Sequence, residues 1–264
     1  MADYLHATMY AWRQISIWTT FFFVSRSFDN LSTTELYQLH GKPYEVPTRR
    51  LDGKPSTPHA PPCVIYPMIW NMPANEVMDP EIIISDYGTH TPALYSPPEE
   101  SFNEHITTAA DIWTLGVVLY DAMSERPLFE TFAWDPDDII AEMVNTLGQL
   151  PARWWGSWTN HSEFFNPDGS WITNFQRIGT PVFRHLHQRM WDMGRGEMPE
   201  ACEWDVAGGE LKALEDMLRA MMAFEPAERP TAKQLMMSEY MVKWAMPAWE
   251  RQMKRKRAYA VEQR

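Results

Sequence analysis

One stretch of the sequence, residues 109–130, constrains the fold more than any other. It reads AADIWTLGVVLYDAMSERPLFE, and its apolar side chains wrap nearly the whole circumference of a helix. A helix of that kind is enclosed by other elements of a domain. Asp111 stands in the expected first turn, where a carboxylate faces the positive end of the helix dipole and can accept backbone N–H bonds. Pro127 is expected to end the helix. We therefore predict a buried helix at the centre of the domain.

Composition narrows the class of protein. The chain has 264 residues, of which 45% are apolar and thirteen are tryptophan. That is enough apolar surface for one large continuous core. A net charge of −12 argues against a nucleic-acid partner, because such partners are bound by Lys and Arg. The two cysteines, Cys63 and Cys202, predict neither a disulfide framework nor a zinc site, and they indicate a reducing compartment.

Two segments bear on localisation. The apolar run at 17–24, IWTTFFFV, is too short to span a bilayer and lacks the flanks of a signal peptide. We therefore expect no membrane association and an intracellular protein, in the cytoplasm, the nucleus or both. Near the other end, Lys254–Arg257 reads KRKR. It is either a nuclear import signal or the solvated end of a helix, and the second reading is favoured.

In the first third of the chain, some segments have clear sequence patterns of a helix or strand and others do not. Residues 3–16 allow a short helix, and Phe21–Val24 has the composition of a strand. The run LSTTELYQLHG at 31–41 predicts a helix, with Ser32 and Glu35 as a capping box and Gly41 as the stop. The residues that follow, 42–62, read as an irregular surface insertion. A strand over Glu81–Ile84 is expected to deliver Asp86 to a loop.

After the central helix, three segments have helical patterns. Residues 135–151 carry a proline in the first turn and apolar residues at helical spacing. Further helices are expected over 181–191 and over 209–226, where Pro226 is the stop. Thr231 is expected to cap a helix that follows, and the chain is expected to end in a basic helix or tail.

Two groups of side chains could form binding sites. Trp154, Trp155 and Trp158 would suit a peptide or sugar platform, but clustered tryptophans in a loop-rich region more often pack as a satellite core. His185 and His187 have no cysteine or carboxylate set beside them, so they do not predict a metal site. We favour packing for the tryptophans and no metal at the histidines.

Segments in fixed order resemble the carboxyl-terminal lobe of a eukaryotic-type serine/threonine protein kinase. Asp86-Tyr87-Gly88 follows an apolar strand, as the Asp-Phe-Gly motif does, and Ser96-Pro97-Pro98-Glu99 resembles the Ala-Pro-Glu end of the activation segment. Asp111–Gly116 resembles the D-x-W-x-x-G of the lobe's central helix. Glu225–Thr231 resembles the later turn whose arginine pairs with the Ala-Pro-Glu glutamate. The order of the segments is more specific than any one of them.

The resemblance implies a fold and a set of residue roles. The fold would be mainly α, a kinase-like large lobe with a few short strands and with the small lobe absent. Asp86 would be the ligand of magnesium-ATP, and ATP, magnesium and a protein substrate or partner are implied with it. An ion pair between Glu99 and Arg229 is predicted. The residues with implied structural roles are Gly88, Glu99, Asp111, Gly116 and Arg229.

The resemblance narrows to fungal kinases related to the SR-protein kinases. In that group an insertion lies between the catalytic loop and the Asp-x-Gly strand, which would account for the irregular stretch of this chain. The implied division is a poorly assigned segment at 1–28, an insertion at 29–80, a kinase-like lobe at 81–250 and a basic tail at 251–264.

Departures from the family pattern bear on activity. No glycine precedes Gly41, so no Gly-rich phosphate loop is found, and Lys42 and Lys54 lie in loop-like Gly-Lys-Pro contexts. No catalytic residue is identifiable, because the stretch before Phe21 holds neither the base aspartate nor the metal-binding asparagine. We expect a truncated member of the family that is weakly active or inactive. The alternatives are a non-catalytic interaction module and an incomplete gene model of an active kinase, which translation of the upstream DNA would separate. Substrate, partners and oligomeric state stay open.

Overall fold

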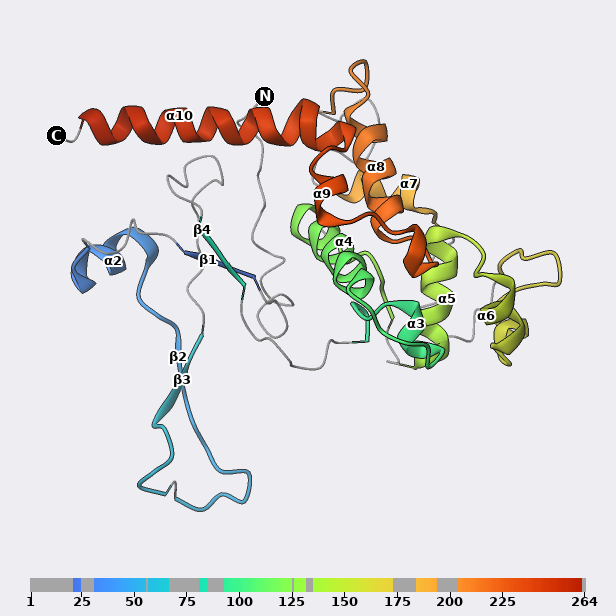
Figure 1. Ribbon diagram of the computed structural model, residues 1–264. Coiled ribbons are helices and arrows are strands. Elements are labelled where there is room, and N and C mark those ends of the chain that lie inside the picture. The colour runs from blue at the N-terminus through green and yellow to red at the C-terminus, as the bar shows by residue number, and fades with distance from the viewer. Residues whose placement is uncertain are drawn as a thin grey trace.

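The computed structural model describes residues 21–24, 31–55, 57–66, 81–84, 93–124, 126–131, 135–172, 184–193 and 204–262. The mainly helical fold expected from the sequence is confirmed for these residues. The helices from α3 onward form a helical body, and two small sheets precede it in the chain (Figure 1). The helix expected over 3–16 lies outside the described residues.

The first sheet joins two segments that are far apart in the sequence. β1 (Phe21–Val24) pairs antiparallel with β4 (Glu81–Ile84), with Phe21 opposite Ile84. Both strands were predicted from their β-branched and aromatic composition, and both are confirmed. The ladder brings the residue at the start of β1 next to the end of β4, two residues before Asp86 in the sequence.

The insertion is more regular than the sequence suggested. α2 (Thr33–His40) is confirmed with its capping box, and Gly41 ends it at a φ of 81°. The stretch after α2, expected to be irregular, instead contains β2 (Glu45–Pro47), which pairs antiparallel with β3 (Cys63–Ile65). The hairpin was not predicted because the two short strands are separated by a long loop rich in proline. Tyr66 extends the pairing by donating its N–H to the Tyr44 carbonyl.

The central helix, α4 (Ala109–Met123), ends earlier than expected. Pro127 does not terminate it, since the chain already turns at Ser124, which is extended at a φ of −106° and a ψ of 151°. The following residues fold back on the helix because the Asp121 carboxylate accepts the Leu128 N–H at 2.8 Å. The Ser124 hydroxyl fixes the turn by donating to the Asp192 carbonyl.

The rest of the body consists of short elements joined by turns. In chain order they are α3 (Pro98–Ser101), α5 (Pro136–Leu147), α6 (Ala152–Ser157), the 3-10 turn His161–Glu163, α7 (Leu186–Arg189), the 3-10 turn Met190–Asp192, α8 (Glu210–Met221), the 3-10 turn Pro226–Glu228, α9 (Ala232–Leu235), the π-helical segment Met241–Ala245 and α10 (Met246–Glu262). The predicted helix over 135–151 and the Thr231 cap are confirmed. The basic end of the chain is helical, and α10 runs across the expected boundary between residues 250 and 251.

Two predicted helices are shorter than expected, for identifiable reasons. The helix expected over 181–191 begins at Leu186, because His185 is extended and its N–H donates to the Gln188 side chain. The helix expected to reach Pro226 ends at Met221. Beyond it, the carbonyls of Ala223 and Phe224 accept hydrogen bonds from the Arg229 side chain.

The main core forms where α4 meets α8. Trp113 and Tyr120 of α4 and Leu214 and Leu218 of α8 have no exposed surface. Gly116 makes the close approach possible, since a Cβ atom at this position would lie 3.1 Å from the Met221 Cβ and from the Met222 Cγ. One face of α4 is fully buried, whereas other apolar side chains of this helix, expected to be enclosed, are only partly buried.

A second cluster joins α5, α6 and the turns that follow. Trp154 and Trp158 are buried in it with Phe164 and Phe165, and Trp155 packs on its edge. The packing role favoured for these tryptophans is confirmed. No helix in the described part of the chain is long and apolar enough to cross a membrane.

Candidate functional site

A buried ion pair joins the start of the helical body to its end. Arg229 and Glu99 have no exposed side-chain surface. The two guanidinium Nη atoms donate to the two carboxylate oxygens at 2.7 and 2.6 Å. The ion pair predicted from the sequence is therefore present, and its two-point geometry is the strongest form that such a pair takes.

Arg229 also bonds to three backbone carbonyls. Its Nε donates to Ala223 at 2.8 Å, and its Nη atoms donate to Ala109 and Phe224 at 3.1 Å each. All five N–H groups of the guanidinium are thereby used. The group also lies 5.1 Å from the centre of the Trp113 ring. One side chain thus fixes α3, the first turn of α4 and the turn after α8.

A second contact holds the segment before α3 against the central helix. The Tyr95 hydroxyl donates to Asp121 at 2.8 Å, and the Thr114 hydroxyl donates to the Tyr95 carbonyl at 3.1 Å. Burial raises the pKa of Asp121 to about 6, against hydrogen bonds from the Leu128 N–H and from Tyr95 that lower it. Burial, and then the Asp121 charge, raise the pKa of Tyr95 far above its ordinary value. Asp121 is therefore a carboxylate that the fold holds at an energetic cost.

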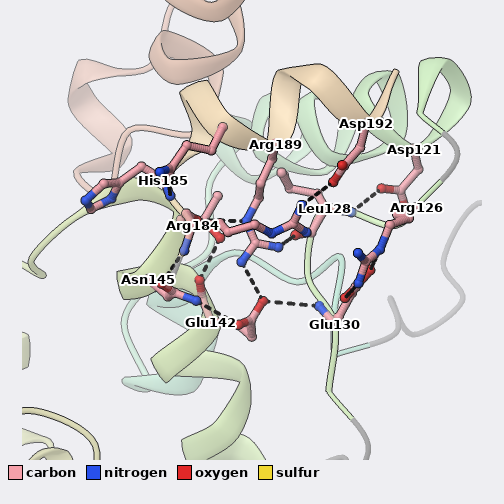
Figure 2. A network of polar contacts seen from close by, with 12 residues as sticks. Asp121, Arg126, Leu128, Glu130, Glu142, Asn145, Arg184, His185, Arg189 and Asp192 are labelled. Atoms are coloured by element: carbon pink, nitrogen blue, oxygen red, sulfur yellow. Dashed lines mark hydrogen bonds and ion pairs between the residues drawn. The ribbon is translucent and has the colours of Figure 1, made fainter. Parts of the chain in front are cut away.

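A third network, shown in Figure 2, lies between α5 and α7. Arg189 and Glu142 are 1% and 2% exposed, and their nearest atoms are 3.0 Å apart. Arg189 also donates to the carbonyls of Leu128 and Arg184 at 2.6 and 3.0 Å. Glu142 accepts from the Asn145 side chain at 3.2 Å, so neither charge is left without partners.

The same network reaches the central helix. The Tyr120 hydroxyl donates to the Arg189 carbonyl at 2.6 Å. Arg184 forms an ion pair of 2.7 Å with Asp192, whose carbonyl accepts from Ser124. Hydrogen bonds therefore join the end of α4 both to α7, through Tyr120, and to the 3-10 turn that follows α7, through Ser124.

The predicted site residues fall into three groups. Glu99 and Arg229 are joined, and Gly116 lies at the closest approach of two helices. Asp111 is exposed in the first turn of α4, and no described residue hydrogen bonds to its carboxylate. Its expected backbone N–H bonds are not found, because Thr108, three residues before Asp111, holds the N-cap position. Asp86 and Gly88 lie outside the described residues.

Sequence reasoning missed four residues of these networks: Tyr95, Asp121, Glu142 and Arg189. Two of them carried a usable signal. Asp121 is a carboxylate in the largely apolar second half of α4, and Glu142 interrupts the apolar stripe of α5. A charge at such a position predicts a buried partner. Arg189 lies in the predicted helix over 181–191 and Tyr95 in a segment without a regular pattern, and the partners of both follow only from the fold.

The described residues do not supply a metal site by themselves. No three His, Cys, Asp or Glu side chains among them come together as ligands. His187 Nδ1 lies at hydrogen-bond distance, 2.7 Å, from a carboxylate oxygen of Glu215.

Comparison with known proteins gives two findings. The family model of the protein kinase domain matches residues 83–241, which hold all three networks. Two curated proteins of Aspergillus fumigatus, one from strain CEA10 and one from strain Af293, are described as serine/threonine protein kinases. Each is 22% identical to this chain over 163 residues, which are 59% of this chain and 36% of the relative. The chain thus matches little more than a third of the length of these relatives.

Proposed function

Because the chain belongs to the protein kinase domain family, we propose that it is part of an intracellular serine/threonine protein kinase of the group related to SR-protein kinases. The proposed activity is transfer of the ATP γ-phosphoryl group to serine or threonine hydroxyls of proteins. The observation that supports it best is the buried pair of Glu99 and Arg229, in which residues of two family-like segments meet. The similarity to fungal serine/threonine kinases points the same way.

We further propose a role for each segment of the chain. Residues 81–250 would be the large lobe and 29–80 an insertion of the SR-related type, preceded by residues 1–28 and followed by a tail at 251–264. In this scheme α4 is the scaffold, with Asp111 placed to hold a catalytic loop. Gly88 and Asp86 would follow β4, and Asp86 would be the ligand of magnesium-ATP.

Phosphoryl transfer needs several charged groups acting together. Bound magnesium would neutralise charge on the ATP phosphates, and in this chain Asp86 is the residue offered for it. These 264 residues contain neither a G-x-G-x-x-G loop nor a His-x-Asp sequence. A lone carboxylate binds Mg²⁺ weakly. We therefore propose that this stretch alone transfers phosphate slowly or not at all.

A second candidate function is a non-catalytic interaction module. It is favoured by the way the body is held together. The five N–H groups of Arg229 are all bonded within the chain, and Arg189 and Glu142 satisfy each other with nearby groups. The buried ion pairs of Arg229 and Arg189 are therefore complete without a nucleotide.

The proposed weak activity is tested on the purified chain with one of the Aspergillus relatives assayed in parallel. With 1 mM magnesium-ATP, a site with a Kd of about 10 μM would add about 2.7 kcal/mol to the free energy of unfolding, which is several degrees in Tm. We expect no shift for this chain and no phosphate incorporation into a peptide rich in Arg-Ser pairs. A clear shift, or transfer that Asp86→Asn abolishes, would show that the chain is itself an active kinase.

The family role is tested separately by a chimera. The Aspergillus relative supplies everything before the position of Ile83, and this chain supplies the remainder. We expect the chimera to phosphorylate the peptide and Asp86→Asn to lower its kcat by about 10²-fold or more, the scale of losing one preorganised charge contact. A folded chimera that binds ATP but transfers no phosphate would favour the interaction module.

A further inference from the structure

The C-terminal helix carries an apolar strip, which we define as Val242, Met246, Trp249 and Met253. Val242 and Trp249 are 50% and 56% exposed, and the two methionines are partly exposed. The four residues recur at intervals of four, three and four, which places them along one side of a helix. α10 leaves the helical body as one straight helix (Figure 1).

Charge is distributed unevenly between this helix and the rest of the chain. Residues 239–264 hold seven of the 23 Lys and Arg residues and three of the 35 Asp and Glu residues, so their net charge is +4 and that of the remainder is −16. The basic side chains lie in the second half of the helix, where Arg251, Lys254 and Arg255 are exposed. An amphipathic helix with a basic half is a typical binding element.

Carboxylates lie where this helix leaves the body. Glu239 and Asp216 are 57% and 58% exposed, and each forms an i,i+4 ion pair within its own helix, with Lys243 and Lys212. Glu215 of α8 is 14% exposed and pairs with Arg219. The pKa of Lys212 is raised by its hydrogen bond to Asp216, and the charges of Glu215 and Glu239 add to this effect. Carboxylates from two elements are therefore close together at the base of the helix.

We propose that residues 239–262 form the interface of a homodimer in which the helices of two copies pair antiparallel. In this arrangement the two apolar strips face each other, with Trp249 of one copy near Met246 of the other and Val242 near Met253. The basic half of each helix lies against the exposed carboxylates at the base of the other. A parallel arrangement would set the two basic halves side by side, where they repel each other.

An isologous contact of this kind closes with two copies. It involves one helix from each, so it is smaller than a typical permanent interface and its Kd lies in the micromolar range. An anionic membrane would also attract a basic amphipathic helix. It would, however, hold the strongly acidic remainder of the chain beside a negatively charged surface. The second copy offers acidic groups to the helix without that penalty.

The test is the mass of the full chain by sedimentation equilibrium from about 5 to 500 μM, a range chosen to bracket a micromolar Kd. We expect the mass to rise from 30.8 kDa toward twice that value. Trp249→Glu and Val242→Glu are expected to raise the dimer Kd at least tenfold, because each places a charge within the apolar contact. Val206→Glu is the matched control: Val206 is 61% exposed but lies before α8, so its substitution leaves the Kd unchanged.

A charge swap tests the antiparallel order. We expect the Kd to rise severalfold in two parent variants, Glu239→Lys and the double variant Lys254→Glu with Arg255→Glu. Combining all three changes should restore the Kd to within about threefold of the original, since opposite charges again face each other. Three results would overturn the proposal: a monomer at every concentration, a dimer insensitive to Trp249→Glu, or a combined variant no tighter than its parents. A monomer that binds vesicles containing phosphatidylserine through Trp249 would replace the second copy with a membrane.

Discussion

The helical body, taken as residues 93–241, and the described part of the insertion, within residues 31–66, are stabilised in different ways. In the body, charged groups are enclosed and paired over long separations, as in the contact of Glu99 with Arg229 across 130 positions. In the insertion no residue of α2 is buried, and α2 and the β2–β3 hairpin rest on local bonds. The kinase family match begins after the insertion and covers the body. Family resemblance and long-range burial therefore coincide in this chain.

The difference predicts two levels of stability. An isolated two-stranded hairpin is marginally stable in water, whereas an element with a buried core opens only with the whole domain. We therefore expect the body to unfold as one unit and the insertion to open locally at lower free energy. Each substitution below is chosen to separate these two behaviours.

The largest effect is expected from Arg229→Ala. It leaves the Glu99 carboxylate buried without its partner and three carbonyls without a donor, which costs about 3–5 kcal/mol. For a chain of this size the Tm should fall by about 6–20 °C. Urea and thermal unfolding followed by tryptophan fluorescence measure the loss. The control is Lys212→Ala, which removes an exposed ion pair with Asp216 and should cost about 0.5 kcal/mol or less. Equal losses for the two variants would contradict the anchoring role.

Much of the body could be predicted from the sequence, because its motifs have a fixed order. The Glu99–Arg229 pair was predicted from the resemblance of two short segments to kinase motifs, and α5 was predicted from its periodicity and its proline in the first turn. The ends of α4 and α8 could not be predicted. α4 ends where Asp121 captures a backbone N–H seven residues ahead, and α8 ends where Arg229 takes the next carbonyls. Both stops depend on contacts that local propensity does not contain.

The insertion shows the opposite limit of sequence reasoning. Its helix was predicted with its cap and its stop because every determinant is local, from Ser32 to Gly41. Its hairpin was not, since β2 and β3 are only three residues each and a loop rich in proline separates them. For the candidate site, Asp121 and Glu142 could have been suspected as charges within apolar helices. Their partners could not, because they come from distant turns.

The second effect concerns pH and the partly buried carboxyl of Asp121. Its pKa is about 6 in the folded chain, against an ordinary value of 3.8. Between these values the folded chain binds more protons than the unfolded chain, so the free energy of unfolding falls as pH rises from 4 to 6. Asp121→Asn removes this loss and should raise the free energy of unfolding at pH 7 by about 2–3 kcal/mol.

The gain from Asp121→Asn should disappear below pH 4, where the native carboxyl is neutral as well. Urea unfolding of both proteins from pH 4 to 8 measures this gain. The contributions of the other carboxylates cancel when the free energy of unfolding of one protein is subtracted from that of the other at each pH. A difference that does not change with pH would show that Asp121 is not a strained charge. Hydrogen exchange in the insertion should be unaffected at every pH, because the change acts on the body alone.

The third effect tests the close approach of α4 and α8. Gly116→Val would force side-chain atoms into Met221 and Met222, and overpacking of this kind costs about 1–3 kcal/mol. Gly116→Ala should be nearly neutral, because a gain in helix propensity of about 1 kcal/mol offsets a mild contact. Gly156 of α6 is the matched control, since nothing lies within 4 Å of a Cβ there. If valine is tolerated equally at both glycines, the two helices do not pack as closely as described.

The smallest effect gives the sharpest contrast, because the body and the insertion each contain a capping box. Thr231 accepts the Gln234 N–H at 3.3 Å, and Ser32 accepts the Glu35 N–H at the same distance. Thr231→Ala should lower the free energy of unfolding by about 0.5–2 kcal/mol, since α9 packs Leu235 into the main core. Ser32→Ala removes the same kind of bond, yet the unfolding of the body should not change. Its effect should be confined to faster amide exchange in residues 33–40, by about tenfold for about 1.4 kcal/mol lost locally. If Ser32→Ala instead lowers the Tm as much as Thr231→Ala does, the insertion is part of the same cooperative unit as the body.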